Sequence, residues 1–219
     1  MLVKPRLRLA LLTAALAGVV LSVTGGGVAS AASVAAPGHL RRTGSDTSVF
    51  VAGDSITKMS TPELRHLGLG WEVDAQGGRS VTSLGWVLGE RLARGPAPRV
   101  VVAALGANAD PGWDAVSGYR AMIAQLPETT IVVFVSVYRD PRYFTRRVSR
   151  QRPDWNPAYS AAYTRAMYEV AATRPHTCVA PWRPWAQKHR ANLTGGVHPH
   201  RYGRWAWARI VAATVASCG

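Results

Sequence analysis

The chain has 219 residues, and its 26 lysine or arginine residues outnumber its 12 aspartate or glutamate residues, which gives a formal net charge of +14. Hydrophobic residues make up 47% of the sequence, enough for a packed core, so a largely disordered chain is excluded. With only two cysteines, neither a disulfide-dense miniprotein nor a cysteine-based zinc module is possible. The length suits one domain.

The N-terminal segment has the pattern of a secretory signal peptide. Lys4, Arg6 and Arg8 precede a long uncharged apolar run, and Ala29-Ser30-Ala31 supplies small residues for cleavage. A membrane anchor is the alternative, because the uncharged run is long enough to span a bilayer. We expect cleavage, an exported protein and no stable membrane insertion. The expected divisions are a signal peptide at 1–31, a flexible leader at 32–47 and one folded domain at 48–219.

The positive charge of the domain favours anionic partners. Removal of the signal peptide takes away three basic residues and no acidic ones, so the rest of the chain stays strongly basic and attracts polyanions. Export favours acylated carbohydrates or anionic cell-wall polymers over nucleic acid, for which charge is the only argument. A composition that serves only solubility is the alternative. We expect a monomer that binds no nucleic acid.

Export also bears on the two cysteines. Cys178 and Cys218 are the only pair in a chain expected to enter an oxidising compartment. We therefore predict a disulfide that ties the last strand to the C-terminal helix. The alternative is two buried free thiols.

Strand and helix patterns alternate along the domain. Short apolar runs predict buried strands at residues 49–52, 71–75, 100–105, 131–137 and 177–180. Apolar residues at helical spacing predict helices at 81–94, 115–126, 158–173 and 202–216. This alternation indicates a parallel sheet covered by helices on both faces. In such sheets the chemistry gathers at the carboxyl ends of the strands.

Four loops at the expected reactive edge carry the parts needed for acyl transfer. Ser55, in Gly53-Asp54-Ser55, offers a hydroxyl at a strand-to-helix turn, and His198 offers a base for its proton. Gly78 lets a backbone N–H approach a developing oxyanion, and the amide of Asn108 can donate to the same oxygen. Taken singly, each residue also fits a structural use as a cap, turn or loop residue.

In this order the four blocks resemble the GDSL/SGNH hydrolases, from residue 49 to the end of the chain. The resemblance implies a three-layer α/β/α sandwich of the flavodoxin-like type, with about five parallel strands in the central sheet. It implies Ser55 as nucleophile and His198 as base, with an oxyanion hole formed by Ser55, Gly78 and Asn108. It also implies a secreted esterase that acts on small acyl groups, most plausibly O-acetyl groups on a carbohydrate, without a cofactor or metal. An acceptor sugar in place of water would make the protein an O-acyltransferase.

The sequence departs from the family pattern at the acid of the triad. The family has Asp three residues before the histidine, where this chain has Gly195, and no Asp or Glu follows Glu169. Three alternatives follow: an esterase with a Ser–His dyad, an enzyme that uses a distant acid, and a domain that binds the cell wall or polyanions without turnover. Ala109 also stands where many members have Asp after the asparagine. Asp54 is expected to act as a cap or hydrogen-bonding support rather than as the catalytic acid.

The segment 139–152 contains six arginines and two aromatic residues after the fourth predicted strand. It is either a solvated basic loop or a wall of the substrate cleft, with arginines facing carboxylate or phosphate and aromatic rings facing sugars. The expected substrate-binding residues are Arg79, Arg142, Tyr143, Trp155 and Asn156. His200 is expected at the surface or in the cleft wall. The remaining histidines show no spacing that indicates a metal.

Overall fold

A computed structural model describes residues 46–218, so the expected signal peptide and nearly all of the expected leader lie outside the described residues. Five parallel strands form one sheet in the order β2-β1-β3-β4-β5, which is the flavodoxin-like order. The strands are β1 (Asp46–Gly53), β2 (Trp71–Ala75), β3 (Val100–Ala104), β4 (Ile131–Val135) and β5 (Thr177–Ala180). The predicted α/β sandwich with a five-stranded parallel sheet is confirmed.

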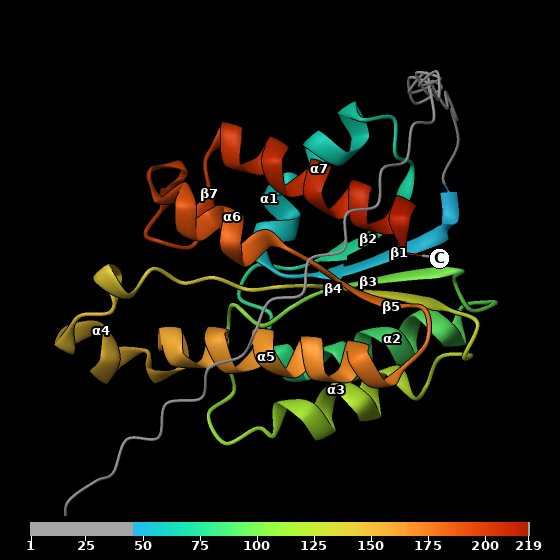
Figure 1. Ribbon diagram of the computed structural model, residues 1–219, viewed down its shortest axis with the longest axis horizontal. Coiled ribbons are helices and arrows are strands. Elements are labelled where there is room, and N and C mark those ends of the chain that lie inside the picture. Colours follow the sequence, from blue (N-terminus) through green and yellow to red (C-terminus); the bar gives the residue numbers. More distant parts are fainter. Residues whose placement is uncertain (1–45, 219) are drawn as a thin grey trace, which may run out of the picture. The chain divides into compact units, whose positions relative to one another are not determined.

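Helices cover both faces of the sheet (Figure 1). One layer contains α1 (Ser55–His66), α6 (Trp182–Lys188) and α7 (Arg201–Ser217). The other contains α2 (Leu84–Ala93), α3 (Ala115–Ile123) and α5 (Pro157–Thr173). The short helix α4 (Arg146–Gln151) and a hairpin of β6 (Leu193–Thr194) and β7 (His198–Pro199) lie toward one end of the sheet. Among the described residues, no helix combines the length and the apolar character needed to cross a membrane.

Alternating side chains of the central strands build two cores, one under each helical layer. Phe50, Val101 and Phe134 belong to the core beneath α2, α3 and α5. Val51 and Val133 belong to the core beneath α1, α6 and α7. Strands buried on both faces carry continuous apolar runs, which explains why the sequence marks these strands clearly.

The boundaries differ from the predicted ones in a few places. β1 begins at Asp46, two residues before the expected start of the domain, and β3 and β4 end earlier than predicted. The helix expected at 81–94 is a 3-10 turn at Val81–Ser83 followed by α2. No helical range was predicted for α1, whose buried face includes the polar residues Thr57, Ser60 and Glu63. A polar buried face removes the apolar periodicity that indicates a helix.

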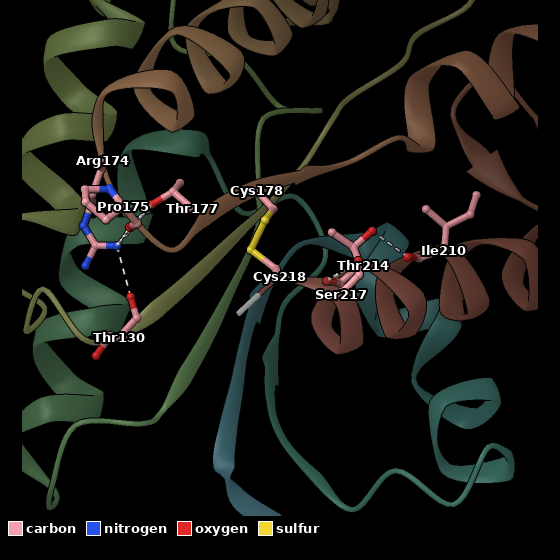
Figure 2. The surroundings of a disulfide bond; sticks show 9 residues. All are labelled: Thr130, Arg174, Pro175, Thr177, Cys178, Ile210, Thr214, Ser217 and Cys218. Carbon is pink, nitrogen blue, oxygen red and sulfur yellow. Dashed lines mark hydrogen bonds between the residues drawn. A yellow bond between two sulfur atoms is a disulfide. The ribbon is translucent and has the colours of Figure 1, made fainter. Parts of the chain in front are cut away.

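A disulfide joins Cys178 of β5 to Cys218, the residue that ends α7, and confirms the predicted bridge (Figure 2). The two cysteines are separated by 40 positions, so the bond closes a loop that contains α6, the β6–β7 hairpin and α7. On the other side of β5, Arg174 donates to the carbonyl of Thr130 at 3.0 Å, before β4 begins. The disulfide thus links β5 to the end of α7, and Arg174 links the residues just before β5 to the residue just before β4.

Candidate active site

Ser55 and His198 lie side by side although 143 positions separate them. Ser55 is the first residue of α1, directly after β1 and Asp54, and His198 is the first residue of β7. The distance between Ser55 Oγ and His198 Nε2 is 3.0 Å, which is a hydrogen bond between a hydroxyl and a potential base. The structure therefore brings together the two residues that the sequence motifs single out for nucleophile and base.

The turn that presents Ser55 is built by its neighbours. Oδ1 of Asp54 accepts a hydrogen bond from the Ile56 N–H at 2.9 Å and caps α1, as expected for this residue. A Cβ at Gly53 would lie 2.2 Å from Thr57 Oγ1, so only glycine fits where β1 turns into the helix. Burial raises the pKa of Asp54 to about 6, although the hydrogen bond from Ile56 and the charge of Arg139 act in the opposite direction.

His198 is presented by a tight hairpin. Thr194 pairs with His198 across the two short strands, and the Val197 N–H donates to the Thr194 carbonyl at 3.3 Å. Gly195 and Gly196, between them, both have positive φ, at 57° and 70°, as in a type I′ turn. A Cβ on Gly196 would lie 2.6 Å from the ring of Tyr143, so the second glycine is also required for space.

No acid replaces the missing carboxylate in the part of the chain that the structure describes. The hydrogen bond to Ser55 is the one that the His198 ring makes with the described residues. Burial lowers the pKa of His198, and the positive charge of Arg139 lowers it further. Both effects favour the neutral imidazole, which is the form that accepts a proton.

Gly78 and Asn108 lie in two loops that are tied together. Gly78 has a φ of 76° in the turn after β2, and Asn108 follows β3. Nδ2 of the buried Asn108 donates to the Arg79 carbonyl at 3.2 Å, and the Asn108 carbonyl accepts from the Val81 N–H at 3.1 Å. Because the order of the sheet reverses between β1 and β3, Ser55 and Asn108 flank the switch point where α/β proteins bind ligands.

Arg139, which the motifs do not single out, is the main addition to the site. Its buried guanidinium donates from Nε to the Ala107 carbonyl at 2.7 Å and from Nη2 to Asn108 Oδ1 at 3.3 Å. Its carbon Cζ lies 4.9 Å from the centroid of the Trp155 ring. Burial lowers the pKa of Arg139 to about 10, while Asp54 and Asp154 support its charged form. The arginine-rich segment 139–152 is the only sequence signal for this residue, and it does not distinguish one arginine from the others.

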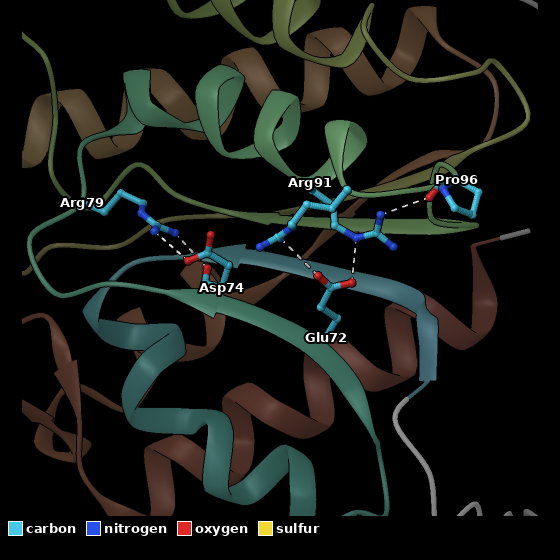
Figure 3. A network of polar contacts seen from close by, with 6 residues as sticks. Glu72, Asp74, Arg79, Arg91 and Pro96 are labelled. Atoms are coloured by element: carbon cyan, nitrogen blue, oxygen red, sulfur yellow. Dashed lines mark hydrogen bonds and ion pairs between the residues drawn. The ribbon is translucent and has the colours of Figure 1, made fainter.

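Arg79, expected to bind substrate, is used inside the protein instead. Its side chain is 6% exposed and forms an ion pair of 2.7 Å with Asp74 (Figure 3). It also donates to the carbonyls of Asp74 and Gly53, at 2.9 and 3.3 Å. Through these bonds Arg79 links the turn that contains Gly78 to β1, the strand that ends before Ser55. The hydrogen-bonding groups of its guanidinium are used for these internal contacts. The neighbouring ion pair of Glu72 with Arg91, in the same view, fastens the edge strand β2 to α2.

Two of the other four expected binding residues also have structural contacts of their own. Arg142 is paired with the buried carboxylate of Asp140, whose Oδ2 lies 2.9 Å from the arginine Nε. Asn156 caps α5 by accepting from the Ala158 N–H at 2.9 Å. The alternative of a purely solvated loop does not describe segment 139–152, because Arg139 and Asp140 are buried.

Tyr143 and Trp155 border a hollow of about 200 Å³ that we call the Trp155 hollow. Its wall also includes Arg139, Phe144, Val148 and Gly195. The ring of Trp155 is held between two guanidinium groups, with Cζ of Arg152 at 4.2 Å from its centroid. Since Gly195 belongs to the hairpin that carries His198, the hollow borders that hairpin, and Arg139 in its wall contacts Asn108.

Comparisons with known proteins place this fold among the GDSL/SGNH hydrolases. No model of a protein family matches the sequence, and no curated protein matches it. The C-terminal catalytic domain of peptidoglycan O-acetyltransferase A from Streptococcus pneumoniae is 18% identical, with a TM-score of 0.66 over 80% of this chain and 96% of that domain. A lipolytic G-D-S-L family member from Veillonella parvula has a TM-score of 0.58 at 13% identity, covering 77% of this chain and 97% of its own. A carbohydrate esterase family 3 protein from Talaromyces cellulolyticus has a TM-score of 0.55 at 16% identity, covering 77% and 96%. The resemblance indicated by the four motifs is thus confirmed at the level of the fold.

Proposed function

We propose that this protein is an exported serine enzyme that cleaves or transfers small acyl groups, chiefly O-acetyl groups, on a carbohydrate polymer. The observation that carries the proposal is the 3.0 Å contact between Ser55 Oγ and His198 Nε2 at the switch point of the sheet. The similar solved structures support the same class, since they include an O-acetyltransferase domain and a carbohydrate esterase.

In the first step, Ser55 Oγ attacks the carbonyl carbon of the ester while His198 Nε2 takes the hydroxyl proton. The carbonyl oxygen of the ester becomes an oxyanion, and the Ser55 N–H at the start of α1 is one donor for it. The Gly78 N–H and Asn108 Nδ2 are the other two donors that we assign. Asn108 Nδ2 carries two hydrogens, and one already serves the Arg79 carbonyl, which leaves the second for the oxyanion.

In the second step, His198 returns its proton to the leaving sugar oxygen, and the acyl group stays on Ser55. Water, activated by the same imidazole, then releases the acyl group as a carboxylic acid. A sugar hydroxyl in place of water would transfer the acyl group to an acceptor by the same proton movements. The charge of the imidazolium has no carboxylate beside it in the described residues, so we assign a Ser–His dyad rather than a triad.

Export is part of the proposal. The signal-peptide pattern of residues 1–31 and the disulfide between Cys178 and Cys218 are both typical of proteins that leave the cytoplasm. An exported basic protein with this fold meets acylated polysaccharides and anionic wall polymers before it meets nucleic acid. These polymers are the partners that we assign.

Hydrolysis of p-nitrophenyl acetate by the purified protein and its Ser55→Ala variant tests the proposal. We expect the variant to lose nearly all activity over background, and a fluorophosphonate to label the wild type at Ser55 alone. Ser217→Ala serves as the matched control, because Ser217 is exposed at the end of α7. Equal rates for the wild type and Ser55→Ala, with no labelling, would instead support the non-catalytic binding domain.

A second measurement separates hydrolysis from transfer. Free acetate and acetylated chito-oligosaccharide are quantified after the enzyme has been given an acetyl donor together with the oligosaccharide. Acetate alone indicates an esterase, while an acetylated oligosaccharide that disappears in Ser55→Ala indicates a transferase.

A further inference from the structure

A second, larger hollow shares Tyr143 with the Trp155 hollow. It has a volume of about 700 Å³, and its walls include Arg142, Tyr143, Lys188, Arg190, Leu193 and His200. We call it the basic groove. Tyr143 belongs to both hollows, and its ring packs against Gly196 in the hairpin that carries His198. The two hollows therefore border the same hairpin.

Two of the three cations of the basic groove, Lys188 and Arg190, form no ion pair with an acid in the described residues, whereas Arg142 is paired with Asp140. Lys188 ends α6, Arg190 follows it, and Arg142 comes from the loop after β4, so three positive charges converge from two segments. In the described part of the chain, no carboxylate is among the residues that line the groove. Asp140, the nearest acid to Arg142 in the sequence, is buried and bonded to that arginine.

Two of the three cations are held in place by hydrogen bonds that leave part of each guanidinium available. Arg142 contacts Asp140 through Nε and Nη2, and Arg190 donates from Nε to the Gln187 carbonyl at 3.0 Å. An arginine that is already oriented loses less conformational freedom when it binds an anion, and its planar fork matches carboxylate and phosphate.

A buried hydroxyl lies close to the same charges. Tyr138 Oη is buried and has no hydrogen-bond partner within the described residues. Burial raises the pKa of Tyr138 and Asp140 raises it further, whereas Arg190 and Arg142 lower it. Arg142 and Arg190 thus both act on Tyr138, in agreement with their place in the lining of one groove.

We propose that the basic groove is an anion subsite for the polymer, which holds a carboxylate or phosphate of one sugar unit while a neighbouring acylated unit lies in the Trp155 hollow. The inference rests on the proposed acyl-transfer function and assigns its substrate to anionic rather than neutral glycans. Tyr143, 51% exposed between the two hollows, offers a ring face on which the connecting sugar can stack. The subsite acts through the binding of the polymer and not through the bonds that Ser55 makes or breaks.

Binding is measured in the Ser55→Ala protein, so that loss of turnover and loss of the subsite are distinguished. Calorimetric titration with oligogalacturonate, inorganic phosphate and neutral chito-oligosaccharide compares three variants in this background: Lys188→Gln, Lys188→Gln with Arg190→Gln, and Arg99→Gln as the matched control. Arg99 is an exposed arginine just before β3, at the opposite end of the strands from the site. Thermal unfolding of each variant confirms that it is folded.

We expect the double variant to bind oligogalacturonate or phosphate about fivefold or more weakly, since it removes two charge-assisted contacts to the anion. Lys188→Gln alone weakens binding by a smaller factor, Arg99→Gln leaves it unchanged, and the neutral oligosaccharide responds to none of the substitutions. Preference for oligogalacturonate identifies carboxylate as the anion, and preference for phosphate identifies phosphate. The proposal is overturned if the double variant binds oligogalacturonate and phosphate as tightly as the Arg99→Gln control does. It is also overturned if the double variant loses binding to a thymidine oligonucleotide of matched charge by the same factor.

Discussion

Arg139 holds the side-chain oxygen of Asn108, with its Nη2 atom 3.3 Å from Oδ1. The amide of Asn108 can therefore take only one orientation, because Oδ1 accepts from the arginine while Nδ2 donates to the Arg79 carbonyl. A charged donor on Oδ1 also polarises the amide and makes its N–H a stronger donor. Arg139 thus positions one donor of the proposed oxyanion hole without being one itself.

Replacement of Arg139 tests this positioning role. We expect Arg139→Gln to lower kcat/KM by about 10- to 100-fold, since hydrogen bonds to charged groups contribute about 1.5–3 kcal/mol. The loss should fall mainly on kcat, because the polarised amide acts on the transition state. Arg139→Lys keeps the charge but not the two-pronged geometry and should recover only part of the activity. An Arg139→Gln enzyme that is folded and as active as the Arg99→Gln control would contradict this role.

The pH dependence of activity follows from the environment of His198. Burial and the charge of Arg139 lower the pKa of His198 below its ordinary value of 6.5. The base must be neutral to accept the Ser55 proton, so kcat/KM should rise with pH and reach half of its plateau below pH 6.5. Removal of the positive charge in Arg139→Gln should move this inflection to higher pH.

Asp54 titrates in the same range, with a pKa of about 6, and needs its own control. Asp54→Asn removes the titrating carboxyl but keeps a good helix cap. We expect its pH profile to retain the inflection of the wild type. Loss of the inflection in this variant would assign the titration to Asp54 and not to His198.

Gly195 offers a position at which the missing acid can be supplied. No heavy atom lies within 4 Å of a Cβ built on Gly195, and aspartate tolerates its left-handed backbone better than most residues do. We expect Gly195→Asp to raise the pKa of His198 and to increase kcat/KM by about tenfold or more at neutral pH. Gly195→Asn, of nearly equal size and without charge, is the control, and identical pH profiles for the two variants would show that the acid does not reach the imidazole.

The disulfide should make a large contribution to stability. A bond that closes a loop of 40 positions restricts the unfolded chain by an amount that corresponds to about 4 kcal/mol. We expect the double substitution Cys178→Ala with Cys218→Ala to lower the free energy of unfolding by about 2–4 kcal/mol. Urea unfolding of this variant and of the reduced wild type gives the measurement. Unfolding free energies equal to that of the oxidised protein would show that the bond does not stabilise the fold.

The sequence predicts the sheet well because its central strands are buried on both faces. Val101 and Val133 belong to continuous apolar runs that only strands of a covered sheet require. Helix α1 gives no such signal, since its buried face includes Thr57 and Glu63. Helix α6 has only seven residues and contains Pro184, so it is too short for its periodicity to be recognised.

For the site, residue types predict which groups meet, but not what supports them. Ser55, Gly78, Asn108 and His198 are recognisable because acyl transfer uses such groups and because their order along the chain resembles that of the GDSL/SGNH hydrolases. Arg79 and Arg139 carry the same charge in the sequence, and only tertiary contacts show that one is bonded to Asp74 and the other to Asn108. The pKa of His198 is lowered by burial and, to a smaller extent, by Arg139, 59 positions away in the chain, so this lowering could not be derived from local sequence.

The contact between Ser55 and His198 spans 143 positions. Strand β1 directly precedes Ser55 in the chain, and the other four strands of the main sheet lie between the two residues. The pair therefore cannot form before the chain has been translated as far as His198. A chain that ends before His198 holds the serine without its proposed base. Under the proposed function, activity requires two distant segments of the domain in their native places, so it would report correctly assembled molecules in a preparation of this protein.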